Sequence, residues 1–155
     1  MADPNSKSSH DDTMATSISH FNKTPWCKAL IADPKWEPVT TVTRIAKRST
    51  EDAFFAETLA SERTIRQILT LYPREGEVRE CRTIMELGPS VNGHPGLAHG
   101  GFVATVLDEI LGLLISMKFG REWEEANRRG ENPRLRPIFT ACEYLPSFTF
   151  LKGGS

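Results

Sequence analysis

A glycine pair and an aspartate near the middle of the chain have the types and spacing that acyl chemistry uses. Gly100 and Gly101 stand where a helix over about residues 101–119 is predicted to begin, and Asp108 lies eight residues after Gly100. The first amides of a helix have no partner within it and lie at the positive end of its dipole, so they can hold an oxyanion. A desolvated carboxylate at Asp108 is a stronger base than a solvated one, which suits general-base work on water or direct attack on an acyl carbon.

Spacing alone leaves two interpretations of this aspartate open. Gly100 and Asp108 are separated by about 12 Å along a helix axis, so one helix cannot easily place both groups on one reacting carbon. A second, antiparallel copy of the helix would bring them together, which hints at a dimer. In the other interpretation Asp108 lies on the exposed side of the helix beside Glu109. Glu109 points about 100° away and is expected to be a solvated or ion-paired surface acid.

The composition limits the classes of partner. The 155 residues suit one domain, and 19 basic against 20 acidic residues, a net charge of −1, give no general field for nucleic acid. Cys27, Cys81 and Cys142 lie far apart without a metal-ligand pattern, so reduced thiols in the cytoplasm are expected, with mitochondria and peroxisomes left open. No signal peptide is recognised, and the longest apolar run, about residues 110–115, is too short to span a bilayer.

The chain divides into three predicted segments. Residues 1–22, rich in Ser, Asp, Asn and Thr, are expected to form a disordered tail. Residues 23–75 are expected to form a helical lead-in arm, with Trp26 and Trp36 anchoring it on the domain. Residues 76–155 are expected to form the domain that carries the glycines and the aspartate.

Local patterns predict the elements within these segments. A short helix over Trp26–Ala32 is followed by an extended stretch, and capping signals at Ser49 or Thr50 and at Ser61 predict two short helices that end at Pro73. A strand is predicted over residues 78–88, a loop over 89–101, and strand again in PIFTACEYLPSFTFLKGGS at the end of the chain.

The segment HPGLAHGGFVATVLDEILGLLI resembles the HGG-x6-D segment of hotdog-fold acyl-CoA thioesterases, especially the PaaI-like and THEM-like branch found in fungal proteins. The stretch KALIADPKWEPV and the residues STEDAFFAETLASERTI are similar to the helical lead-in of those proteins. The likeness covers about residues 27–140. It implies an α+β chain in which an antiparallel sheet wraps a central helix and two subunits pair.

The resemblance also implies roles for individual residues. The backbone N–H of Gly100 would polarise the thioester carbonyl, and Gly101 would let the substrate pass close to the helix start. Asp108 from the partner subunit would act as nucleophile or general base, and Thr140 would orient the attacking water. The remaining candidates are substrate-binding residues: His99, which would shape the loop, and Asn92, which lies one residue from a position that carries Asn in some relatives.

The final residues depart from the family pattern, and alternatives to hydrolysis follow from that. After Thr140 the expected strands are absent, which predicts marginal stability unless a dimer or another partner covers the helix. The chain could therefore be a non-catalytic, truncated isoform that binds acyl ligands or pairs with a longer relative.

An enoyl-CoA hydratase on the same fold fits poorly. That class needs a histidine five residues after the aspartate, and Leu113 stands at this position. No cofactor or metal is expected; the expected partners are an acyl-CoA or acyl-carrier thioester and a second copy of the chain, with no nucleic acid.

Overall fold

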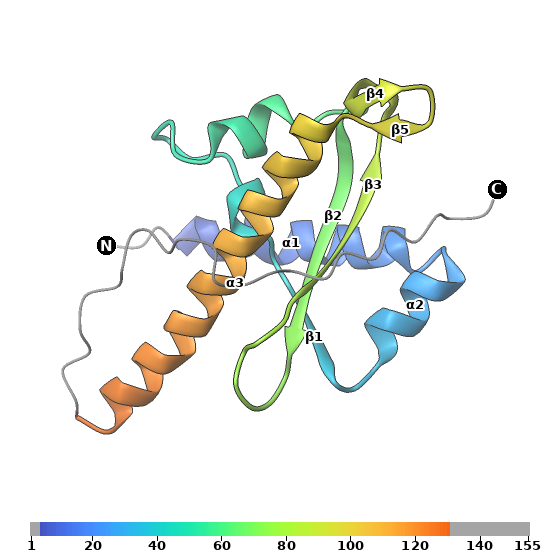
Figure 1. Cartoon of the computed structure of the whole chain (residues 1–155). Coiled ribbons are helices and arrows are strands. Elements are labelled where there is room, and N and C mark those ends of the chain that lie inside the picture. The colour runs from blue at the N-terminus through green and yellow to red at the C-terminus, as the bar shows by residue number, and fades with distance from the viewer. Residues whose placement is uncertain (1–3, 131–155) are drawn as a thin grey trace.

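The computed structural model describes residues 4–130, in which three helices and an antiparallel sheet form an α+β arrangement (Figure 1). The chain is thus α+β, as expected. Thr140 and the predicted C-terminal strand lie outside the described residues. In chain order the elements are α1 (Pro4–Phe21), α2 (Pro25–Ala32), β1 (Trp36–Val39), η1 (Val42–Arg44), η2 (Phe54–Thr58), β2 (Ile65–Pro73), β3 (Arg82–Leu87), η3 (Pro89–Val91), β4 (Asn92–His94), β5 (Leu97–Ala98) and α3 (Gly100–Arg128).

Strand β2 is the centre of the sheet, with β1 and β3 antiparallel on either side of it. Trp36 pairs with Pro73 at one end of the β1–β2 ladder. Along β3 the register runs from Ile65 opposite Leu87 to Leu71 opposite Arg82, and it shifts at a bulge between Ile65 and Gln67. A separate two-stranded hairpin, β4–β5, leads directly into α3.

Each face of the sheet buries its own hydrophobic cluster. Leu69 and Leu71 of β2 pack with Phe21 of α1, Cys27 of α2 and Trp36 of β1. The cluster on the opposite face consists of Phe55 from η2 with Ile65 and Ile68, and Phe102 from the first turn of α3 packs against it. Helices α1 and α2 therefore cover one face, and η2 and α3 lie on the other (Figure 1).

The expected disordered tail is wrong over most of its length, since residues 4–21 form α1. Met14, Ile18 and Phe21 recur at helical spacing and pack on the cluster that contains Trp36. Ser17 on the same face is buried and donates a hydrogen bond to Gln67 Oε1 at 3.2 Å. This narrow apolar stripe is hidden in a polar composition, which is why the composition favours disorder.

The second predicted lead-in helix is also wrong, because residues 65–73 form strand β2. Ile65 and Ile68 are three residues apart, a helical spacing, yet both contribute to one cluster on one face of the sheet. The bulge between Ile65 and Gln67 adds a residue and so breaks the alternation expected of a strand. Strand β2 also hydrogen-bonds to β3 across the boundary expected between residues 75 and 76.

Other predicted elements are confirmed, some with different bounds. The short helix is α2, the extended stretch contains β1, and the predicted strand over 78–88 is β3. Only a short π-helix, η2, occupies the place of the first lead-in helix, and the predicted loop over 89–101 contains η3 and the β4–β5 hairpin. Trp36 is 1% exposed and anchors its strand, whereas Trp26 is 39% exposed.

Helix α3 is fixed to the sheet near Phe102 and again three-quarters of the way along its length. Leu113 is buried, and the guanidinium of Arg121 donates to the carbonyl oxygens of Pro73 at 2.6 Å and Gly76 at 3.2 Å.

Residues 100–121 of α3 are long and apolar enough to cross a membrane, with a mean hydropathy of 1.6, whereas the sequence prediction rested on the shorter apolar run at 110–115. Length and composition alone are weak evidence for a membrane span, and only 6% of this apolar stretch is buried within the described structure.

Candidate functional site

The site predicted from the sequence lies at the start of α3, where the β4–β5 hairpin meets the helix. The backbone N–H of His99 donates to the carbonyl of Val91 at 2.8 Å, and its carbonyl accepts from the N–H of Val103 at 3.0 Å. A Cβ on Gly93 would lie 3.1 Å from the Cα of His99. The hairpin therefore packs its backbone against His99 and fixes where the helix begins.

The imidazole of His99 caps the helix. Its Nδ1 accepts a hydrogen bond from the backbone N–H of Gly101 at 3.0 Å. This bond satisfies one of the first helical amides, the task that Asn, Asp, Ser or Thr side chains usually perform. A Cβ on Gly101 would lie 3.1 Å from Nδ1 and 3.3 Å from Cε1 of His99, so the ring position favours glycine. His99 therefore shapes this loop through a hydrogen bond, and its expected role in binding substrate stays a prediction.

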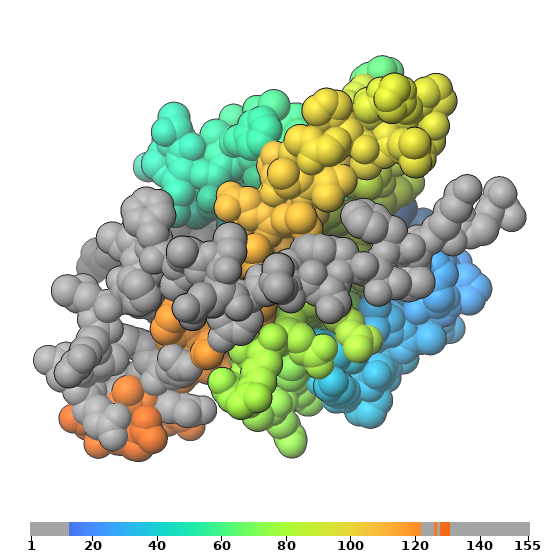
Figure 2. Space-filling view, viewed as in Figure 1, coloured from blue at the N-terminus to red at the C-terminus, as the bar shows by residue number. Residues whose placement is uncertain are grey.

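Gly100 differs from Gly101 because its surroundings are open. Nothing lies within 4 Å of a Cβ placed on Gly100. Within the part of the chain that the structure describes, its N–H has no hydrogen-bond acceptor. The first turn of α3 lies at the surface beside the β4–β5 hairpin (Figure 2). An incoming acceptor can therefore reach this amide at the positive end of the helix dipole.

One edge of α3 is exposed and made of small side chains. Asp108 is exposed on this edge, so the expected desolvated carboxylate is not found, and the interpretation that places Asp108 on the exposed side of the helix holds. It lies between Ala104 and Gly112, each four residues away. Residues four apart are neighbours on a helix surface, and each step of four turns about 40° further around the axis, so these positions form a slanted row. The members of this row, called the α3 outer line below, are Gly100, Ala104, Asp108, Gly112 and Ser116, all exposed.

Glu109 does not behave as the solvated surface acid that was expected. It is half-buried, and desolvation raises the pKa of its carboxyl group. The nearby hydroxyl of Thr43 opposes this rise, although that buried hydroxyl makes no hydrogen bond of normal geometry among the described residues. The negative charges of Asp52 and Asp108 add to the rise, and Lys47 lowers it. Glu109 therefore faces the segment between η1 and η2, while its neighbour Asp108 faces away.

Thiol and metal chemistry find little support in the described residues. Burial raises the pKa of the Cys27 thiol, and burial together with the charge of Glu80 raises the pKa of Cys81 to about 11. A thiol with a raised pKa is a poor nucleophile at neutral pH. No group of three His, Cys, Asp or Glu side chains suited to a metal ion occurs in residues 4–130.

The other predicted site residues lie at different distances from the helix start. Asn92 is exposed in β4 and pairs with Ala98 of β5, so it belongs to the hairpin that carries His99. Thr140 lies outside the described residues, so its proposed role stays a prediction. Gly100 and Asp108 lie on the same outer line of α3, but their separation along the axis is about 12 Å.

Sequence reasoning missed a cavity on another part of the fold. It has a volume of about 380 Å³ and lies between α1, β2 and the segment after β1, with Arg44 and Gln67 among its lining residues. No motif marks these residues, because their proximity depends on α1 and on strand pairing, neither of which the sequence predicted.

Comparison of the chain with protein-family models, with curated proteins and with solved structures finds no match.

Proposed function

We propose that the chain hydrolyses acyl thioesters, such as acyl-CoA or acyl-carrier thioesters, as a dimer of hotdog-fold subunits. The observation that carries this proposal is the α3 outer line, which presents an open backbone N–H at Gly100 and an exposed carboxylate at Asp108. The HGG-x6-D resemblance of the same residues gives the arrangement its chemical interpretation.

The helix start supplies the oxyanion site. The thioester carbonyl oxygen would accept a hydrogen bond from the N–H of Gly100, whose surroundings leave room for it. A donor aimed at developing oxyanion charge typically contributes about 3–4 kcal/mol to transition-state stabilisation. Capping of the neighbouring Gly101 amide by His99 holds the first turn in place while leaving the Gly100 amide available.

The distance along α3 requires two copies of the chain. Asp108 is about 12 Å from Gly100 on its own helix, too far to serve the same carbon. Two antiparallel α3 helices that cross near Ala104 would bring Asp108 of one copy toward Gly100 of the other. Small side chains on the outer line favour this pairing, because they let a second helix approach closely.

The reaction needs water and a base but no cofactor. The carboxylate of Asp108 takes a proton from water as the water oxygen attacks the acyl carbon, and the carbonyl oxygen becomes an oxyanion at Gly100. The C–S bond then breaks, the carbonyl re-forms, and the thiolate receives the proton held by Asp108, which gives the free thiol and a carboxylic acid and restores the carboxylate. Thr140 would orient the water in this scheme. We place the reaction in the cytoplasm, since the cysteine pattern fits reduced thiols.

The test of the base is thiol release from a panel of acyl-CoA esters by the parent chain and two matched variants. Asp108→Asn should lower kcat/KM at least a hundredfold, because it removes the proton acceptor. Glu109→Gln is the control: it removes the adjacent carboxylate, which faces another part of the fold, and should keep activity within a few fold. All three proteins must first give one symmetric size-exclusion peak.

The test of the oxyanion site uses two variants at one position. Gly100→Pro removes the N–H yet suits the first position of a helix. Gly100→Ala keeps the N–H and adds a methyl group into open space. The proposal expects Gly100→Pro to lose at least tenfold more kcat than Gly100→Ala. A folded, monodisperse parent without turnover of any ester would instead support the non-catalytic alternative, a binder of acyl ligands or a dimer partner.

A further inference from the structure

The cavity between α1 and β2 has features of a binding site that are independent of α3. Twelve residues line its volume of about 380 Å³, and none of them belongs to α3. Pockets that bind small molecules usually fall in the range of about 300–1,000 Å³. Most of the polar lining residues are hydroxyl or amide groups: Thr13, Thr16, Ser17, Thr40, Thr41 and Gln67.

The charge of the cavity comes from two arginines, only one of which is balanced. Arg66 lies 3.1 Å from the carboxylate of Glu86. Arg44 has no carboxylate within 4.0 Å among the described residues; its guanidinium donates instead to the carbonyl oxygens of Phe55, at 2.9 Å, and Ile65. Burial lowers the pKa of Arg44, but the group stays charged at neutral pH. A half-buried positive charge without a counter-ion favours an anion in the adjacent space.

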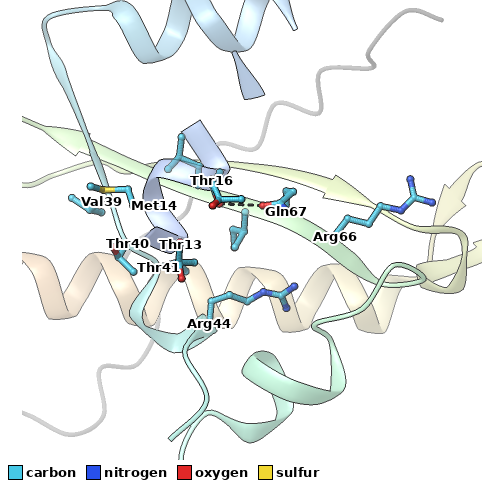
Figure 3. Close-up of a pocket in the computed structure, with 12 residues that line it drawn as sticks. Thr13, Met14, Thr16, Val39, Thr40, Thr41, Arg44, Arg66 and Gln67 are labelled. Atoms are coloured by element: carbon cyan, nitrogen blue, oxygen red, sulfur yellow. Dashed lines mark hydrogen bonds between the residues drawn. The ribbon is translucent and has the colours of Figure 1, made fainter. Parts of the chain in front are cut away.

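Hydrogen-bond donors converge with this charge. A guanidinium carries five N–H groups, and the two carbonyl bonds of Arg44 leave three for a ligand. Gln67 accepts from Ser17 through Oε1, while its amide nitrogen donates no hydrogen bond within the described part of the chain. Gln67 and Arg66 lie on one side of the cavity, with Met14 and Val39 on the other (Figure 3).

We propose that this cavity binds a small amphipathic anion, with its oxyanion head at Arg44 and Gln67 and its apolar body against Met14 and Val39. A carboxylate or a phosphate can supply the head, because both accept several hydrogen bonds from a guanidinium. The site does not depend on the proposed hydrolysis, since it shares no residue with the start of α3.

Isothermal titration calorimetry on the whole chain tests this proposal with three probes: hexanoate, inorganic phosphate and neutral 1-hexanol. Hexanoate should bind at least tenfold more tightly than 1-hexanol. Arg44→Gln should weaken hexanoate binding at least tenfold, and Arg79→Gln, which removes an exposed arginine outside the cavity, should not. Asp108→Asn should also leave the affinity unchanged, which separates this site from the proposed catalytic site.

Arg44 also holds η1 to Phe55 and Ile65, so Arg44→Gln can weaken binding simply by disturbing the fold. A second variant that leaves these contacts intact is therefore needed. Gln67→Glu keeps the shape and the acceptor for Ser17 but adds a negative charge, so it should weaken hexanoate binding at least tenfold. Phosphate binding with the same dependence on both residues also supports the anion site and identifies a phosphoryl head. Equal affinities for hexanoate and 1-hexanol, or no binding of either anion to the folded chain, would overturn the proposal.

Discussion

The imidazole of His99 and the backbone N–H of Gly101 form a hydrogen bond of 3.0 Å that closes the first turn of α3. His99 thereby acts as a side-chain cap, and the histidine of the HGG motif acquires a structural explanation that does not require contact with substrate. The neighbouring amide of Gly100 stays open, so one glycine of the pair serves the cap and the other is available to a ligand.

Loss of this cap should destabilise the chain. We expect His99→Ala to lower the free energy of unfolding by about 1 kcal/mol, the usual cost of removing a helix cap. His99→Asn should recover most of the loss, since asparagine is among the best capping residues. Thermal unfolding of the parent and both variants measures both changes. Equal stability of the alanine variant and the parent would contradict the capping role.

A close backbone contact makes Gly88 the least replaceable glycine of the described chain. A Cβ there would lie 2.4–2.6 Å from backbone atoms of Glu62 and Arg63, and the N–H of Gly88 donates to Thr64 at 2.6 Å. We expect Gly88→Ala to cost at least about 2–3 kcal/mol, because backbone atoms must shift.

Gly120 provides the matched control for that substitution. It lies inside α3 with nothing within 4 Å of an added Cβ. Gly120→Ala should stabilise the chain by about 0.5–1 kcal/mol, since alanine is the better helix former. Denaturant titration of both variants checks the pair, and a Gly88→Ala variant as stable as Gly120→Ala would show that the turn adjusts freely.

The pH dependence of stability should carry a contribution from Glu109. Because its folded pKa is raised, mainly by burial, the folded state binds more protons than the unfolded state between the two pKa values. Stability from this group is therefore complete below the unfolded pKa and decreases as the pH rises through the folded pKa. Glu109→Gln should raise the Tm at pH 7 relative to the parent.

The same variant should lose its advantage near pH 4, where the parent carboxyl is also neutral. Thermal unfolding of both proteins from pH 4 to pH 8 measures this trend. Asp108→Asn serves as the comparison, because Asp108 is exposed on the α3 outer line. A Tm difference between Glu109→Gln and the parent that grows toward low pH would be the opposite sign and would contradict the burial of Glu109.

The α3 outer line should determine self-association if the proposed dimer forms. Gly112→Leu places a large side chain between two closely packed helices and should weaken the dimer at least tenfold. Ser116→Ala keeps the line small and should not. Light scattering during size exclusion over a range of concentrations measures both. A parent that stays monomeric at high concentration removes the basis for a shared site and leaves Asp108 without its partner glycine.

The sequence predicted the elements with strong local signals. Gly100 and Gly101 mark the start of α3, and β3 lies where β-branched residues were found, because both signals act over a few neighbouring residues. Strand β2 was mispredicted because the bulge gives Ile65 and Ile68 a helical spacing on one face of the sheet. That spacing depends on the pairing with β3, which no local pattern records.

The candidate site was predicted only where its features depend on neighbouring residues in the sequence. The helix start and its open N–H at Gly100 follow from local spacing, whereas the capping contact of His99 with the Gly101 amide was found only in the structure. The opposite orientations of Asp108 and Glu109 depend on which side of α3 meets the segment around Thr43, and periodicity does not reveal this. Arg44 and Gln67 lie 23 positions apart and meet only through the fold.

Strand β2 contributes side chains to both hydrophobic clusters, Leu69 and Leu71 to one and Ile65 and Ile68 to the other. Unfolding of either cluster exposes apolar side chains of the same strand, so the two clusters should not unfold independently. Their loss should be a single cooperative event in which the amides of β2 exchange with solvent only upon global unfolding. One bulged strand thus joins the N-terminal helices and η2 into one folding unit, although they lie on opposite faces of the sheet.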